Sequence, residues 1–511
     1  MSLEGHPFGI GRVVVVIMYE TGSGNVPIHE ATSLERGCSA VVPRASAKEQ
    51  NRLVRVAVRI SRKLLVIPIS MYRHPGRAAS IFVLLLFILS SGGMIAAYLW
   101  ASYHLRAARS ALERYHTSEA IPHLRAALFV WSHDPEALLL SARASRRTDE
   151  FDRASHYLDQ YQEVRGPDDE SLLLERVLVA AESGDVDSVS KYCQGLVKQD
   201  HPATPLILEA LSRGYLRMYR LHEAEFCIKE WFRHQPDNTQ AFLIQAQLYD
   251  LQGRQSEAIA SYRSALKIDP QMDEARLRLC IGLMQLGSIA EALPQLEYIH
   301  QRFPDNFMVQ VYLARAYDRQ GRSEEAENLL DAILKNQPHF AAALAERGKL
   351  ALRAGQNEQA EKWLHEAITL NPSDHPSHYQ YLLCLERNGK LEDLKNEQAR
   401  LQTIENDIQL IQQLSTVRMQ QTPHDPELHY QAGIISQRAG SAQEALRWFQ
   451  SALREDPNHA PTHKALAEYY DSIGDYGRAR EHRQKAGAGG SVVSKTEDGK
   501  KPGTMPRRAN P

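Results

Sequence analysis

The chain has 511 residues and a formal net charge of −2, but this charge is distributed unevenly. Residues 1–77 hold eleven Lys and Arg against five acids, and residues 487–511 hold five against two, so the segment between them carries the negative excess. A long acidic segment favours solubility and argues against bulk nucleic-acid binding, which needs a basic surface.

The N-terminal segment 1–77 is basic, and we expect it to be cytoplasmic and partly disordered. Four arginines spaced along residues 52–62 share one helical face, which is compatible with a basic amphipathic helix on an anionic membrane; a disordered tail explains them equally well. Met71 directly precedes a complete signal-anchor pattern, so the true start remains open between Met1 and Met71.

Residues 78–102 are predicted to form a transmembrane helix. No charged residue occurs from Ala78 to Tyr103, and about 20 apolar helical residues cross a hydrocarbon core. Tyr98, Trp100 and Tyr103 gather at one end, as in an interfacial aromatic belt. A buried soluble helix and a cleaved signal peptide are the alternatives. More Lys and Arg precede the span than follow it, which predicts a cytoplasmic N-terminus and an extracytoplasmic remainder, periplasmic if the source is bacterial.

A short internal repeat dominates the rest of the chain. Prolines recur at one constant interval from Pro202 to Pro372, and Pro423 and Pro457 are separated by the same interval. Glycine precedes five of these prolines by half a period, as Gly253 precedes Pro270, and alanine follows the glycine at a fixed offset in most units. Glycine suits the end of a first helix, small alanines suit a close helix crossing, and proline ends the second helix. Each unit therefore reads as a helix hairpin that must stack on its neighbours.

This pattern resembles the tetratricopeptide repeat family. The resemblance rests on a small residue at the eighth position, the mid-repeat glycine, alanine at the twentieth position and the terminal proline, and it covers roughly residues 103–486. It implies an all-α fold, a right-handed superhelical solenoid of helix hairpins with a concave groove, here preceded by one transmembrane helix. We expect residue Ser256 to cap the second helix of its unit.

The array becomes irregular at both ends. Residues 103–421 form the main array, whose last unit is degenerate and leads into a long polar helix at 391–421, where we expect a break or bend. Residues 422–486 form a C-terminal pair, and residues 487–511 read as a disordered tail. The segment 102–115 lets the membrane helix run directly into the first unit.

Motifs for catalysis are absent from the sequence: it contains no HExxH, GxxxxGK[ST], GxSxG or GxGxxG pattern and no CxxC pair. The five cysteines read as small apolar residues of the core. His375 and His378 form the closest histidine pair, but no third ligand is evident. We therefore expect no enzymatic activity, no cofactor and no metal.

Cationic side chains fall at positions that face the groove in the family. Arg315 and Arg319 lie one helical turn apart, and Lys349 and Arg353 occupy the equivalent positions of the next repeat. Stacking should bring them together as a strip of like charges, which an acidic peptide would neutralise; a solvated helix face is the alternative. The candidate partner-binding residues are Arg278, Arg315, Arg319, Lys349 and Arg353, and Arg213 and Arg217 repeat the pattern nearer the N-terminus.

The residues that would form the carboxylate clamp of chaperone-binding family members are missing: Leu243 and Gln247 stand where that clamp needs lysine and asparagine. The sequence thus favours a membrane-tethered scaffold or adaptor that binds a protein or peptide in its groove, without predicting its oligomeric state. The alternative is a regulatory or substrate-presenting subunit of an envelope or glycosyltransferase-type complex.

Overall fold

The computed structural model describes residues 75–493, which fall into two compact units, 75–141 and 142–493. Every regular element in this range is helical, so the expected all-α solenoid of helix hairpins is confirmed. The expectations about residues 1–74, including the basic amphipathic helix and the start at Met71, lie outside the described residues, as does the tail after Val493. Residues 487–493, assigned above to that tail, instead continue the last helix, α25.

The first unit is built on one long helix, α3, which runs from Pro75 to Glu113 without interruption. Its stretch Leu86–Glu113 is long and apolar enough to cross a membrane, judged by length and composition alone. The helix then continues into the first hairpin, as expected, and packs against α4 (Thr117–Val130). Small buried residues of both helices, among them Ala101, Ala108 and Ala120, allow this close packing.

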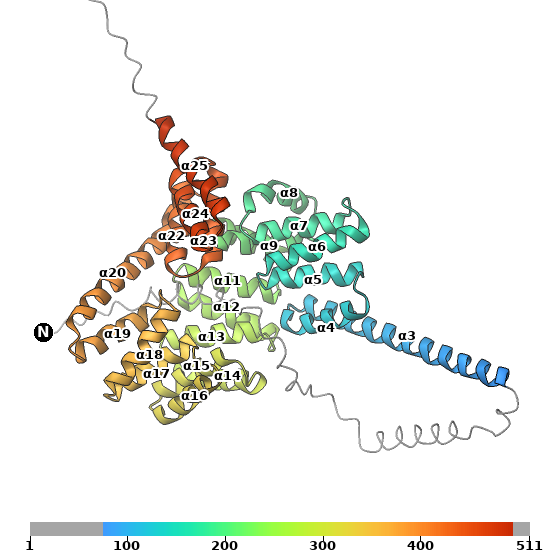
Figure 1. Ribbon diagram of the computed structural model, residues 1–511, viewed down its shortest axis with the longest axis horizontal. Helices are drawn as coiled ribbons and strands as arrows, with labels where there is room; N and C mark the ends of the chain where they lie inside the picture. Colours follow the sequence, from blue (N-terminus) through green and yellow to red (C-terminus); the bar gives the residue numbers. More distant parts are fainter. Residues whose placement is uncertain (1–74, 494–511) are drawn as a thin grey trace, which may run out of the picture. The chain divides into compact units, whose positions relative to one another are not determined.

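The second unit begins in α5 (Pro135–Arg147) and consists of helix pairs (Figure 1). From α7 onward the two helices of each pair contact one another, and each pair packs on the next. Its helices up to the end of the regular array are α6 Phe151–Arg165, α7 Glu170–Glu182, α8 Val186–Lys198, α9 Thr204–Arg217, α10 Leu221–His234, α11 Thr239–Leu251, α12 Gln255–Ile268, α13 Asp273–Gln285, α14 Ile289–Arg302, α15 Phe307–Arg319, α16 Ser323–Asn336, α17 Ala341–Arg353, α18 Asn357–Leu370 and α19 His375–Arg387.

The turn inside each hairpin needs one residue with positive φ. In the regular repeats this residue is glycine, for example Gly253 at φ 71°, because glycine has no Cβ that opposes this conformation. In the irregular N-terminal repeats Tyr115, Asp149 and Tyr219 adopt the same conformation, at φ 62°, 61° and 55°. The hairpin geometry therefore persists where its glycine signature is lost.

Close helix crossings occur at the small residues that the repeat pattern picked out. Ala246, Ala258 and Ala265 are fully buried in one apolar cluster. At Gly433 an added Cβ would lie 2.5 Å from the ring of Phe449, so a larger residue does not fit there. Ser256 is not a cap: α12 begins at Gln255, and the residue before it, Arg254, makes no capping hydrogen bond through its side chain.

The regular array ends in the long helix α20 (Leu391–Gln413), which passes through a π-helical turn at Leu414–Arg418 into the short α21 (Met419–Gln421). These elements occupy the segment expected as one long helix, and the π-turn is its local irregularity. The C-terminal helices follow as α22 Pro426–Arg438, α23 Ala442–Glu455, α24 Ala460–Ser472 and α25 Tyr476–Val493.

The C-terminal pair folds back onto repeats near the start of the second unit, a contact that the repeat pattern did not predict. The indole of Trp448 stacks on the ring of Tyr219, with centroids 5.6 Å apart. Met218 joins Leu414 and Trp448 in one buried apolar cluster. Arg217 pairs with Glu444 at 3.1 Å. We call this contact between the α9–α10 region and α21–α23 the closure.

Candidate partner-binding groove

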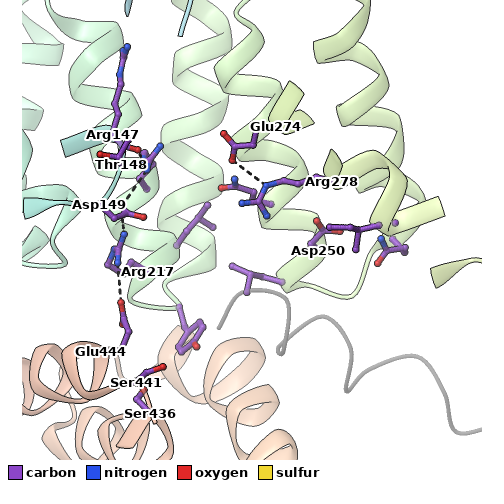
Figure 2. Close-up of a pocket in the computed structure, with 18 of the residues that line it drawn as sticks. Arg147, Thr148, Asp149, Arg217, Asp250, Glu274, Arg278, Ser436, Ser441 and Glu444 are labelled. Atoms are coloured by element: carbon purple, nitrogen blue, oxygen red, sulfur yellow. Dashed lines mark hydrogen bonds and ion pairs between the residues drawn. The ribbon is translucent and has the colours of Figure 1, made fainter. Parts of the chain in front are cut away.

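A cavity of about 440 Å³ lies at the closure, and we call it the closure cavity. First helices of successive pairs, α9, α11 and α13, line one side of it, and α22 and α23 line the other (Figure 2). Its charged residues are Arg147, Asp149, Arg213, Arg217, Asp250, Glu274, Arg278 and Glu444.

The arginines of the closure cavity are engaged by carboxylates of the protein. Figure 2 shows Arg217 between Asp149 and Glu444, with ion pairs to both. Arg213 lies 3.5 Å from Asp149, and Arg278 lies 3.3 Å from Glu274. Cationic and anionic groups alternate around the cavity, so it presents a polar surface without a dominant charge.

Asp250 is the exception among these carboxyl groups. Burial raises its pKa to about 6, although the hydroxyl of Tyr262, the charge of Arg278 and a bond to Gln255 act in the opposite direction. The Tyr262 hydroxyl donates a hydrogen bond of 2.6 Å to one carboxyl oxygen. Desolvation of this kind disfavours the ionised form.

A buried charge network supports the α5, α7 and α9 side of this cavity. Arg146, fully buried, pairs with Glu175 at 2.9 Å and also with Glu182. Arg147 pairs with Glu209 at 2.9 Å. Buried charges of this kind are tolerated when they are paired, and these ion pairs join α5 to both α7 and α9.

A second, smaller hollow of about 170 Å³ lies among α13, α15, α17 and α19. Arg315, Arg319 and Lys349 line it together, and we call it the basic hollow. Three of the five candidate residues therefore share one surface, as their spacing in the repeat suggested. Tyr312 and Gln380 line the same hollow.

The basic hollow differs from the expected strip of mutually repelling cations, because Glu346 lies between them. Arg315 pairs with Glu346 at 2.7 Å and Lys349 does so at 3.2 Å. Burial alone would raise the pKa of Glu346, but the two cations outweigh it and lower that pKa to about 2. Arg319 donates a hydrogen bond of 2.6 Å to the carbonyl oxygen of Met284.

The other two candidate residues lie elsewhere. Arg278 belongs to the closure cavity. Arg353 is not among the residues that line either hollow, and it pairs with Asp318. Sequence reasoning also missed Glu346 and Asp374, both of which line the basic hollow. A search for carboxylates near the cations on the same helix would have found Glu346, which lies one helical turn before Lys349.

Within residues 75–493, one histidine-containing cluster could hold a metal ion, and it does not include the pair His375 and His378. His375 and His378 do not act together: His375 lies 3.2 Å from Glu405, and His378 contacts Glu397. Within residues 75–493, the only group of three with ligand atoms within 4.8 Å of one another is Asp187, His424 and Glu455. His424 and Glu455 lie at the closure and Asp187 on α8, and Asp187 and His424 are exposed to solvent.

The buried cysteines are poor candidates for nucleophilic chemistry. Within the described range Cys193, Cys227, Cys280 and Cys384 are all free and buried. Burial raises the pKa of Cys193 to about 11 and that of Cys227 to about 12. A thiol at such a pKa is almost entirely protonated at neutral pH, which removes the reactive thiolate.

Comparison with known families decides the identity of the repeat. Three family models described as tetratricopeptide repeat match residues 105–170 and 210–273, 283–350, and 341–374. The chain is a tetratricopeptide repeat protein. The matched segments lie within the helical array described above, and the match over 341–374 spans the pair α17–α18.

Curated proteins match parts of this tetratricopeptide repeat protein in sequence. Protein CTR9 homolog of Arabidopsis thaliana is 25% identical over 261 residues, which are 49% of this chain and 22% of that protein. DnaJ homolog subfamily C member 3 of Homo sapiens is 30% identical over 101 residues, 20% of each chain. The alignments thus span about a fifth of each relative's length.

A solved structure of a tetratricopeptide repeat protein from Parabacteroides merdae also matches, with 14% identity and a TM-score of 0.31 over 56% of this chain and 99% of that one. In the tetratricopeptide repeat array of this chain, the first helices of the pairs bear both the closure cavity and the basic hollow.

Proposed function

We propose that the protein is a membrane-tethered adaptor that binds a segment of a partner protein in the basic hollow and performs no catalysis of its own. The observation that carries this proposal is the lining of the hollow by four first helices in succession, α13, α15, α17 and α19. A segment that lies across them contacts several repeats at once, which suits recognition of an extended or helical peptide.

The charge of the basic hollow favours a partner segment with an acidic side chain. Three cations face two carboxyl groups there, Glu346 and Asp374. Burial raises the pKa of Asp374, which disfavours its negative charge. An acidic side chain of the partner would meet the remaining positive charge, and complementary charge adds specificity to such contacts.

Site-specific crosslinking in intact cells tests this proposal. A photoreactive amino acid replaces Tyr312 or Gln380, which line the basic hollow, and in a control it replaces Lys335, which is exposed on α16. We expect both groove positions to crosslink to the same segment of one protein, with an acidic residue in that segment. Adducts no stronger than those at position 335, or unrelated adducts from the two groove positions, would refute the proposed site.

Membrane tethering by α3, with the repeats outside the cytoplasm, is the second part of the proposal. The long apolar helix and the excess of basic residues before it support this orientation. Protease added to cells with a permeabilised outer barrier and an intact inner membrane should degrade the repeat array. Protection until the inner membrane is lysed would reverse the orientation.

A further inference from the structure

The C-terminal end of α4 presents large apolar side chains next to the long helix α3. Phe129 is 88% exposed, the largest exposed fraction among the exposed large hydrophobic residues of the described chain. Close after it, the indole of Trp131 lies against the ring of Tyr98 of α3, with centroids 5.1 Å apart in an edge-to-face arrangement. The first unit, residues 75–141, contains all of these residues.

The contact with Tyr98 sets the depth of this end of α4 relative to the span. The uncharged stretch of α3 extends to Tyr103, and Tyr98, Trp100 and Tyr103 are all exposed near its end. Aromatic residues in that position occupy the membrane–water boundary. Because α4 runs antiparallel to α3, Trp131 reaches the level of Tyr98, and Phe129 lies about 3 Å further from the bilayer centre, given the helical rise of about 1.5 Å per residue.

The separation of about 3 Å between the levels of Trp131 and Phe129 is smaller than the thickness of the interfacial region of a bilayer. The bilayer measures about 30 Å across its hydrocarbon core and about 40–45 Å with its headgroups, which leaves roughly 5–7 Å on each side. Phe129 and Trp131 both fall within such a layer. Arg125 is exposed one helical turn before Phe129 on the same face of α4, where its guanidinium can reach lipid phosphates.

We propose that the end of α4, with Phe129 and Trp131, is a second membrane contact that inserts into the headgroup boundary of the bilayer crossed by α3. The proposal rests on the membrane tethering proposed above and adds a lipid-binding surface to it. A single spanning helix can rotate and tilt, whereas two contacts on one rigid hairpin restrict both motions for the first unit. The exposed Phe129 is then covered by lipid, which accounts for its exposed apolar side chain.

Fluorescence quenching by brominated lipids tests this contact in the full-length protein. The protein is reconstituted in phosphatidylcholine–phosphatidylglycerol vesicles, with an environment-sensitive fluorescent amino acid at position 129, in the span at position 94, or on α16 at position 335. We expect lipids brominated near the headgroup to quench position 129, lipids brominated near the chain end to quench position 94 more strongly, and neither to quench position 335.

The three positions separate the possible failures. If position 94 is quenched and position 129 is not, α3 spans the membrane but the end of α4 does not contact lipid, and the proposal is overturned. A partner protein that covers Phe129 would then be the alternative explanation for this exposed side chain. If neither is quenched, membrane tethering fails and the inference fails with it. Because Phe129 is almost fully exposed, its replacement leaves the packing of the hairpin intact.

Discussion

Glu346 determines how the cations of the basic hollow behave. Helical periodicity places Arg315 and Lys349 on one surface, but it does not reveal the carboxylate between them. With Glu346 in place the two cations stabilise a largely buried charge of opposite sign. Reversing the charge of Arg315 and Lys349 would therefore leave Glu346 among new carboxylates, and such a variant would lose stability as well as any binding. Glu346 itself is the better probe.

We predict that Glu346→Gln reduces stability in a pH-dependent manner. The pKa of Glu346 is lowered from 4.5 to about 2, so its contribution is fully present above about pH 4.5 and is lost as the pH falls toward 2. A pKa shift of this size corresponds to roughly 2–3 kcal/mol in the free energy of unfolding, after allowance for solvent screening of the partly exposed cations. Urea denaturation of the detergent-solubilised protein at several pH values measures it. The exposed Glu324→Gln serves as control, and equal pH profiles for parent and Glu346→Gln would contradict the buried pair.

Asp250 should show the opposite pH dependence. Its pKa is raised from 3.8 to about 6, so the folded state retains a proton that the unfolded state releases, and stability falls as the pH rises through this interval. Relative to Asp250→Asn, the parent should lose about 2–2.5 kcal/mol of unfolding free energy between pH 4 and pH 7. Denaturation curves of both proteins at these two pH values test this. A constant difference between them would show that Asp250 is already ionised at pH 4.

The sequence predicted which residues are neighbours only where equivalent positions of adjacent repeats determine this. The register identified Arg315, Arg319 and Lys349 as neighbours, because residues one repeat apart occupy equivalent places on stacked helices. It could not assign their ion-pair partners, since these depend on side-chain conformations. The separation of Arg278 from the basic hollow likewise depends on the closure, which changes the surroundings of α13.

At the scale of helices, periodic glycines and prolines predicted the regular hairpins. The irregular hairpins near the N-terminus lack this pattern and were recognised only from the structure. Gly253 and its equivalents marked the turns of the regular units. Tyr115, Asp149 and Tyr219 make the same turn with positive φ, which L-residues adopt only at some energetic cost. Burial of the flanking helices offsets that cost, a tertiary effect that a local pattern does not show.

We predict that Ala258→Leu destabilises its own hairpin. Ala258 is fully buried in the cluster shared by α11, α12 and α13, and overpacking such a crossing costs about 1–3 kcal/mol. Hydrogen exchange should accelerate in α11–α13 and remain nearly unchanged in distant pairs, because repeats couple mainly to their neighbours. Ala260→Leu, at an exposed position of the same helix, is the matched control. Equal exchange in both variants would mean that the crossing has been misplaced.

For the whole second unit, the closure is the feature that sequence periodicity could not predict. A repeat pattern describes contacts between adjacent hairpins, whereas the closure joins α9 to α23 across most of the array. The irregular segment α20–α21 makes it possible, because its π-turn and the bond from Gln420 to the carbonyl oxygen of Tyr219 direct the chain back toward α9. The polar character of residues 391–421 indicated an interruption but not its direction.

A double-mutant cycle between Tyr219 and Trp448 tests the closure. In a simple solenoid, residues this far apart in sequence do not interact, so their effects on stability should add. In the closed array the two rings stack, and we expect a coupling of about 0.5–1.5 kcal/mol between Tyr219→Ala and Trp448→Ala. Phe449→Ala provides the control: Phe449 is buried beside Trp448 but packs in the cluster of α22–α24, so its coupling to Tyr219→Ala should be near zero. If Trp448 and Phe449 couple equally weakly to Tyr219, the C-terminal pair does not dock on α9 in solution, and the closure cavity is open to solvent.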